Sequence, residues 1–176
     1  MKGEMIFLVA LSFLRNSIAD KIMCFFSIIG DYGAVWLVLA AVLMVIPKTR
    51  KCGFGILLSV AIGFVFGNVI LKPLIGRPRP VDVLPLFDTG LVPRPNGQSF
   101  PSGHTTSSFA AATAIFGVNK KWGLLAYAVA ALIAFSRMYL FVHYPTDILG
   151  GIVLGVLSAF LAKLLIKYGK KHAQSC

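Results

Sequence analysis

Long stretches of this 176-residue chain contain no charged side chain. Gly53–Leu71 has 19 such residues, and 15 residues each are found in Thr105–Asn119, Trp122–Ser136 and Ile148–Ala162. A straight helix needs about 20 apolar residues to cross a bilayer, and Lys or Arg side chains at its ends can extend a shorter run by reaching the interface. These stretches predict an all-α integral membrane protein, a bundle of about six helices in one domain, residues 1–176.

Composition agrees with a chain that folds in lipid. Hydrophobic residues make up 57% of the sequence and charged residues 13%, with a mean hydropathy of +0.83, whereas a soluble domain carries about 25% charged residues. The net charge is +11, but the basic residues do not form one run, so nucleic acid is not expected as a partner. The cysteines, Cys24, Cys52 and Cys176, suit neither a metal site nor a disulfide framework. No oligomeric state is favoured.

The basic residues predict which ends of the helices face the cytoplasm. Residues 48–51, 120–121 and 163–171 hold nine of the 17 basic residues and none of the six acidic ones. By the positive-inside rule, we place these three segments in the cytoplasm. The long connections, Lys72–His104 and Arg137–Asp147, then lie on the outer side, and they hold nearly every residue capable of chemistry.

Two features near the N-terminus leave the number of spans open. Met5–Leu14 is apolar but only ten residues long, so residues 1–20 are expected to contain a short interfacial or re-entrant helix. Asp20–Ile46 follows and is interrupted by Gly30–Gly33. Either one long kinked helix spans there, which gives five full spans plus the short helix, or the break makes a hairpin, which gives six spans.

The first polar cluster follows the longest apolar run and reads KPLIGRPRP, residues 72–80. Its prolines stiffen an extended chain, and the planar fork of arginine suits phosphate oxygens. Snorkelling to the membrane interface would explain Lys72 but not a rigid Arg-Pro-Arg-Pro sequence. The cluster indicates anion binding, with interfacial snorkelling as the alternative.

The second cluster, FPSGHTT at residues 100–106, opens the next apolar run. Ser102 suits the cap of a helix, and Gly103 lets the backbone approach a ligand closely. The free N–H groups of a helix N-terminus bind anions readily, and His104 would lie in that first turn. The alternative is a helix cap with an incidental histidine.

The third cluster, SRMYLFVHYPTD at residues 136–147, precedes the last apolar run. Pro145 suits the first turn of a helix, which puts Asp147 in the same turn, four residues after His143. A carboxylate there can accept the proton of one imidazole nitrogen and leave the other nitrogen free as a nucleophile. The alternative is an acidic residue favoured by the helix dipole, beside an interfacial histidine.

The predicted topology brings all three clusters to one membrane face. The resulting site would contain several cations, a helix N-terminus, two histidines and one carboxylate. No metal-ligand set is present in the sequence and no cofactor is expected. Such a pocket fits phosphoryl transfer. A transporter or flippase is the alternative class, because intramembrane charges and glycine-rich helices are common there, but the chain has no internal repeat.

The three clusters together resemble the signature of the type 2 phosphatidic acid phosphatase family of lipid phosphate phosphatases. That signature is Lys-x6-Arg-Pro, then Pro-Ser-Gly-His, then Ser-Arg-x5-His-x3-Asp, and it is intact here at residues 72–80, 101–104 and 136–147. The match runs over about residues 53–161, which we expect to form the catalytic core. The resemblance implies a helical bundle shared with vanadium-dependent haloperoxidases.

The resemblance also implies a role for each matching residue. His143 would be the nucleophile that forms a phosphohistidine, Asp147 would orient and charge it, and His104 would protonate the leaving oxygen. The phosphate would be held by Lys72, Arg79, Ser102, Gly103 and Arg137, and Arg77, outside the signature, is kept as an auxiliary contact.

A lipid phosphate substrate and a multi-pass location in a bacterial cytoplasmic membrane, with the site on the extracytoplasmic face, follow from the same resemblance. Undecaprenyl pyrophosphate is the favoured substrate, because a small single-domain chain with an interfacial first helix resembles the phosphatases that act on it. Phosphatidylglycerophosphate or phosphatidic acid is the alternative. The loop of residues 81–98 is expected to shape the headgroup pocket.

Overall fold

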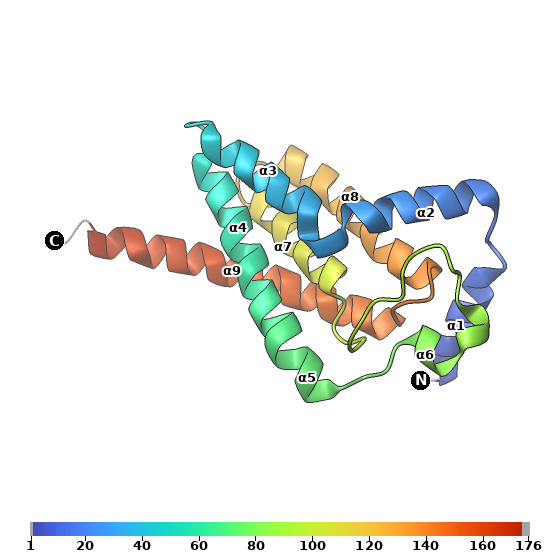
Figure 1. Ribbon diagram of the computed structural model, residues 1–176. Coiled ribbons are helices and arrows are strands. Elements are labelled where there is room, and N and C mark those ends of the chain that lie inside the picture. Colours follow the sequence, from blue (N-terminus) through green and yellow to red (C-terminus); the bar gives the residue numbers. More distant parts are fainter. Residues whose placement is uncertain (1, 174–176) are drawn as a thin grey trace.

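The computed structural model describes residues 2–173, and within that range the chain forms helices and no strands (Figure 1). The expected short N-terminal helix is present, and its 11 residues are too few to cross a membrane. The helices are α1 (Lys2–Ser12), α2 (Ser17–Ile29), α3 (Ala34–Val45), α4 (Arg50–Phe64), α5 (Lys72–Ile75), α6 (Pro80–Val83), α7 (Gly103–Phe116), α8 (Lys120–Tyr139) and α9 (Pro145–Ala173).

Helix α7 lies at the centre of the bundle, where it packs against α4, α8 and α9. Three consecutive alanines on it, Ala110–Ala112, are completely buried. A Cβ atom on Gly155 of α9 would lie only 2.6 Å from the carbonyl oxygen of Thr106 on α7. Small residues therefore let the backbones of α7 and α9 approach closely, as in other helical membrane proteins.

The outward surface of the bundle is apolar. On α9 the small residues Gly151, Gly155 and Ala159 are buried against the bundle, whereas Val153 and Leu157 are more than half exposed. This distribution reverses the pattern of a soluble helical protein and is typical of helices that face lipid. It confirms the expectation of an integral membrane bundle.

Three helical segments are long and apolar enough to span a membrane in the part of the chain described: Arg50–Val83, Lys120–Tyr139 and Pro145–Gly169. Helices α2 and α3 pass the same test together, with a bend of 47° between them. At the break, Tyr32 and Gly33 have positive φ angles of 54° and 70°. The chain bends there without reversing its direction, so the interruption at Gly30–Gly33 makes a kink and not a hairpin.

Helix α7 is shorter than a full span. Its 14 residues cover about 21 Å at 1.5 Å per residue, against a hydrocarbon core of about 30 Å. Because α4, α8 and α9 surround it, α7 lies inside the bundle and can be shorter than the hydrocarbon core is thick.

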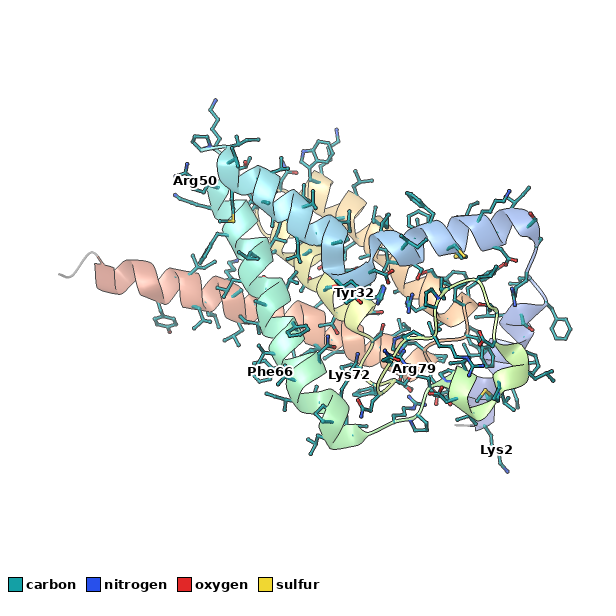
Figure 2. The ribbon with its side chains drawn as sticks, in the orientation of Figure 1. Lys2, Tyr32, Arg50, Phe66, Lys72 and Arg79 are labelled. Carbon is teal, nitrogen blue, oxygen red and sulfur yellow. The ribbon has the colours of Figure 1, made fainter. Side chains whose placement is uncertain are left out.

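The two ends of the bundle differ in character. The α3–α4 turn, the α7–α8 turn and the C-terminal part of α9 lie towards one end, and these are the lysine-rich segments (Figure 1). The connection between α5 and α7 and the turn between α8 and α9 lie towards the other end. Figure 2 shows Arg50 at the first end, and Lys72 and Arg79 at the second. All three polar clusters therefore belong to one end of the molecule.

Candidate active site

A cavity of about 920 Å³ opens at the end of the bundle that carries the polar clusters. Its walls come from α2, α3, α4, α5, α7 and α8, the helical segment Val65–Leu71, the turn between α8 and α9, and the loop at residues 91–96. The loop of residues 81–98 thus contributes to the cavity, as expected. The polar side chains that line the cavity are Ser27, Asp31, Tyr32, Asn68, Lys72, Arg79, Arg94, Asn96, His104, Thr106, Ser107, Arg137 and His143.

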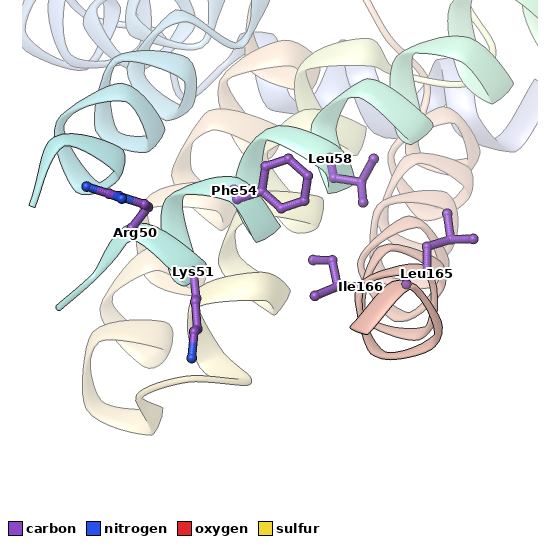
Figure 3. Close-up of a pocket in the computed structure, with 7 residues that line it drawn as sticks. Arg50, Lys51, Phe54, Leu58, Leu165 and Ile166 are labelled. Atoms are coloured by element: carbon purple, nitrogen blue, oxygen red, sulfur yellow. The ribbon is translucent and has the colours of Figure 1, made fainter. Parts of the chain in front are cut away.

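A second hollow, of about 590 Å³, lies between α4 and α9 at the opposite end of α4 (Figure 3). Its walls are Arg50, Lys51, Phe54, Leu58, Leu165, Ile166 and Gly169. The first residues of α4 and α5 are separated by roughly 33 Å along a helix axis, so this hollow is remote from Lys72. The described residues that line it include no histidine, carboxylate or hydroxyl group, and none of them is suited to proton or phosphoryl transfer.

His143 lies in the short turn between α8 and α9, and both of its ring nitrogens have polar neighbours. Nδ1 lies 3.4 Å from Oδ2 of Asp147 and 3.4 Å from Oγ of Ser99. Nε2 lies 3.2 Å from Nη1 of Arg79. Because Asp147 accepts a proton at the Nδ1 side, the lone pair of the neutral ring is at Nε2, beside the cationic side chains.

The surroundings of His143 keep its ring uncharged. The side chain is only 2% exposed. Burial opposes the charged imidazolium, and the positive charges of Arg79 and Arg137 add to this effect. Despite the hydrogen bond to Asp147, the pKa of His143 is lowered to about 3. A neutral imidazole has a lone pair available for attack, which a nucleophile requires.

Asp147 is held in place from several directions. It lies in the first turn of α9, which begins at Pro145 as predicted. Oδ2 accepts a hydrogen bond from the backbone N–H of Tyr144 at 2.8 Å and from the hydroxyl of Ser99 at 2.5 Å. Oδ1 accepts a hydrogen bond from Nη1 of Arg77 at 2.6 Å. The carboxylate is completely buried, so its orientation towards His143 is fixed.

Three cationic side chains from different parts of the chain meet at the cavity. Arg79 is 3% exposed, and its guanidinium donates to the carbonyl oxygens of Gly97 and Val142 at 2.9 and 3.1 Å. Arg137 donates to the hydroxyl of Ser27. Lys72 follows directly after a π-helical turn, Val65–Leu71, a kind of turn that often occurs at functional sites.

Two of these cations have donor groups that no described residue satisfies. Nε of Arg137 is buried without a hydrogen-bond partner in the described part of the chain. Within residues 2–173, Nζ of Lys72 also has no hydrogen bond or ion pair. Buried donors are nearly always satisfied, so the unused Nε of Arg137, beside a cavity that Lys72 also lines, indicates a site for an anion.

His104 is paired with a carboxylate that the sequence patterns did not single out. Its Nε2 lies 2.7 Å from Oδ1 of Asp31. Asp31 belongs to the kink between α2 and α3, and the hydrogen bond joins positions separated by 73 residues. Each histidine of the site therefore has its own aspartate. The Gly-Asp-Tyr-Gly sequence marked a break in the helix but gave no indication of this contact.

Two of the residues expected to contact the phosphate, Ser102 and Arg77, do not line the cavity. Ser102 caps α7 as expected, but it is completely buried, its Oγ accepts from the hydroxyl of Thr105 at 3.0 Å, and it does not line the cavity. Gly103 does line the cavity, and a Cβ atom there would lie 3.2 Å from the side chain of Asn68. Arg77, the auxiliary candidate, is not at the cavity wall but behind Asp147.

No three His, Cys, Asp or Glu side chains are close enough to hold a metal ion among the residues that the structure describes. Cys24 and Cys52 are free thiols, and Cys176 lies outside the described residues.

A helical membrane bundle with a neutral histidine, a buried carboxylate and converging cations defines a phosphoryl-transfer enzyme. Comparison with known families agrees: the PAP2 superfamily matches residues 52–171, and the chain belongs to this superfamily. It is a phosphatase, a hydrolase of phosphate ester or anhydride bonds.

Relatives and solved structures are similar along most of the chain. An undecaprenyl-diphosphatase from Sulfolobus acidocaldarius is 34% identical over 84% of this chain and 71% of its own length. Undecaprenyl-diphosphatase BcrC from Bacillus subtilis is 32% identical over 84% of this chain and 75% of its own. The crystal structure of Aquifex aeolicus LpxE superposes with a TM-score of 0.77 at 25% identity, over 89% of this chain and 92% of that one.

The transmembrane PAP2-type phosphatidylglycerolphosphate phosphatase from Bacillus subtilis superposes with a TM-score of 0.75 at 26% identity. The superposition covers 95% of this chain and 86% of that chain. The similarity between the two proteins therefore includes the arrangement of the helices as well as the three polar clusters of the signature. The expectation of a multi-pass membrane phosphatase is therefore confirmed.

Proposed function

We propose that this protein hydrolyses undecaprenyl pyrophosphate, or a closely related polyprenyl pyrophosphate, to the monophosphate. One observation carries the proposal: a single cavity joins a cationic phosphate site to an apolar wall. Leu37 of α3 and Leu57, Val60 and Phe64 of α4 line the same cavity as Arg79 and His143. Such a cavity suits a substrate with a phosphate at one end and a long hydrocarbon chain at the other.

The names of similar proteins support this choice. Two relatives that are more than 30% identical to this chain are undecaprenyl-diphosphatases. The similar structure from Bacillus subtilis acts on phosphatidylglycerolphosphate, which makes a glycerophospholipid the second candidate.

In the first chemical step, His143 is the nucleophile. Its Nε2 lone pair attacks the terminal phosphorus, a P–N bond forms, and the P–O bond to the leaving group breaks. The leaving oxygen keeps the electron pair of that bond. Asp147 stabilises the positive charge that develops on the ring through Nδ1–H, and Lys72, Arg79 and Arg137 neutralise the phosphate oxygens. Nη1 of Arg79 contacts Nε2 directly, so its donor can turn from the ring nitrogen to a phosphate oxygen placed between them.

His104 donates a proton in the first half of the reaction and accepts one in the second. In the first half it gives a proton to the leaving oxygen, and Asp31 orients its ring for this transfer. In the second half it accepts a proton from water, the water oxygen attacks the phosphohistidine, and the P–N bond breaks. Inorganic phosphate is released and His143 returns to its neutral form.

The membrane orientation is also part of the proposal. The lysine-rich segments at the end opposite the cavity support an active site on the outer face of a bacterial cytoplasmic membrane. A substrate could then enter from the bilayer with its hydrocarbon chain against α3 and α4.

The test is phosphate release in detergent from a panel of lipids: undecaprenyl pyrophosphate, phosphatidylglycerophosphate and phosphatidic acid. We expect the highest kcat/KM for the pyrophosphate and no release by His143→Ala. A higher kcat/KM for phosphatidylglycerophosphate would overturn the polyprenyl assignment and leave the phosphatase mechanism in place.

A further inference from the structure

Asp147 has two faces, and the proposed mechanism uses only one of them. Oδ2 points towards His143, whereas Oδ1 accepts a hydrogen bond of 2.6 Å from Arg77. The side chain of Asp147 is 0% exposed and that of Arg77 is 14% exposed. Arg77 and Asp147 therefore form an ion pair that is largely shielded from solvent, on the side of Asp147 that faces away from His143.

Arg77 supplies the charge that Asp147 needs. A completely buried carboxylate is costly unless a cation compensates it. His143 cannot be that cation, because burial lowers its pKa to about 3 and leaves the ring neutral. The salt bridge with Arg77 therefore compensates the buried charge of Asp147 and adds to the hydrogen bonds from Ser99 and Tyr144 that hold the carboxylate in place.

Arg77 is in turn held by Glu4 of α1, 73 residues earlier in the sequence. Nη2 of Arg77 donates to Oε2 of Glu4 at 2.7 Å. The other oxygen, Oε1 of Glu4, accepts from the backbone N–H of Thr146 at 3.1 Å and from its hydroxyl at 2.5 Å. Burial alone would raise the pKa of Glu4, but the hydrogen bonds from Thr146 and Arg77 outweigh it and lower the pKa below its ordinary value.

Packing fixes α1 in the position that this contact requires. Leu8 and Leu11 of α1 are buried in one cluster with Phe141 and Tyr144, which flank His143 in sequence. The guanidinium of Arg77 lies over the ring of Tyr144, 4.0 Å from its centre, and adds a cation–π contact. Helix α1 therefore packs directly against the turn that carries the nucleophile.

We propose that Arg77 and Glu4 are positioning residues, which hold Asp147 in its reactive orientation through the chain Glu4–Arg77–Asp147–His143. The inference rests on the proposed role of His143. It gives α1 a function in catalysis in addition to its packing. The planar fork of arginine is required, because one nitrogen contacts Asp147 and the other contacts Glu4 at the same time.

The first test compares Arg77→Gln, Arg77→Lys and Arg79→Gln. For both Arg77 variants we expect kcat to fall by about 10- to 100-fold, the cost typical of removing a group that orients a reactive ligand. KM and the inhibition constant of vanadate, a phosphate analogue, should stay at the wild-type values because Arg77 does not line the cavity. Arg79→Gln should weaken vanadate inhibition. Equal weakening by Arg77→Gln would make Arg77 a phosphate ligand and overturn the inference.

The second test uses Glu4→Gln, which keeps the size of the side chain and removes its charge. Its kcat should fall less than that of Arg77→Gln, again with unchanged vanadate inhibition. In the double variant, the loss should be smaller than the product of the two single losses, because both residues act through one chain of contacts. Losses that multiply would contradict the proposed chain.

Arg15→Gln is the matched control. Arg15 forms an ion pair with Asp20 at 3.4 Å, in the same N-terminal region but away from the cavity, and its replacement should leave kcat unchanged. Thermal unfolding of each variant separates lost folding from lost catalysis. If Arg77 and Glu4 variants retain wild-type kcat, the inference fails and the proposed function stands. If His143→Ala retains activity, the proposed function itself fails.

Discussion

His143 and His104 both face the cavity, and their environments suit the different tasks proposed for them. His143 is 2% exposed and neutral beside Asp147, whereas His104 is 17% exposed and contacts Asp31, which is 49% exposed. An enclosed neutral ring suits covalent attack. A ring at the cavity surface suits proton exchange with a leaving group and with water.

Substitution of each histidine should separate these tasks. General acid catalysis is typically worth about 10²–10⁴-fold, and most of it is needed when the leaving group is a poor one. His104→Ala should therefore be severely slow on an alkyl phosphate and much less impaired on p-nitrophenyl phosphate. His143→Ala should be inactive on both, as measured by phosphate release.

Labelling from a ³²P substrate provides the control for this comparison. Acid-sensitive, base-stable label should appear on the wild type and on His104→Ala, and it should be absent from His143→Ala. Label on His143→Ala together with its absence from His104→Ala would reverse the two roles.

Asp31 should act only through His104. Replacement of Asp31 by Asn keeps the shape of the side chain and removes the charge that orients the imidazole. We expect Asp31→Asn to lose activity on alkyl phosphates and to lose much less on p-nitrophenyl phosphate, in parallel with His104→Ala. Phosphate release by the double variant Asp31→Asn, His104→Ala should equal that of His104→Ala alone. A further loss in the double variant would give Asp31 a separate role.

The sequence identified the residues that share a local pattern and missed those that join the site from a distance. Asp147 could be placed beside His143 because the two are one helical turn apart at the start of a helix. Asp31 and Glu4 could not be found in this way, because their partners are 73 and 142 residues away. Such contacts depend on how the helices pack, and no periodicity or spacing in the sequence records them.

At the scale of helices, the contact between α7 and α9 depends on glycine. A Cβ atom on Gly155 would lie 2.6 Å from the carbonyl oxygen of Thr106 and 2.9 Å from the backbone nitrogen of Ala110. Backbone atoms of a packed helix cannot turn aside as a flexible side chain can. An added methyl group would therefore force α7 and α9 apart.

Gly155→Ala should lower the free energy of unfolding by about 1–3 kcal/mol, the usual cost of overpacking. Gly55→Ala on α4 is the control, because no atom lies within 4 Å of the added Cβ position. Alanine favours helix over glycine by roughly 0.5–1 kcal/mol, so this variant should be as stable as the wild type or more stable. Thermal unfolding in detergent measures both variants, and equal destabilisation would contradict the close contact.

The apolar runs predicted the long helices well, because hydropathy alone selects segments that prefer lipid. The short helices α5 and α6 and the π-helical turn Val65–Leu71 were not predicted. The π-helical turn changes the helical register just before Lys72, and its hydrogen-bonding pattern leaves no mark on composition. The region was instead predicted as an uninterrupted apolar span.

For the whole molecule, the distribution of charge predicts the orientation in the membrane. Single cysteines at positions 88 and 120, in a background without the native cysteines, report on the two ends of the bundle. An impermeant maleimide should label position 88 in intact cells and label position 120 only after the cells are opened. Labelling of position 120 but not position 88 in intact cells would reverse the orientation.

The contact between Glu4 and Thr146 also sets an order of events during synthesis. Glu4 leaves the ribosome before Thr146, which follows 142 positions later, an interval on the order of ten seconds at typical elongation rates. During that interval the nascent chain contains Glu4, but the turn that carries His143 is not yet complete. With His143 as the proposed nucleophile, the enzyme gains its activity only when α9 has been inserted, and a chain terminated before residue 143 cannot attack the lipids around it.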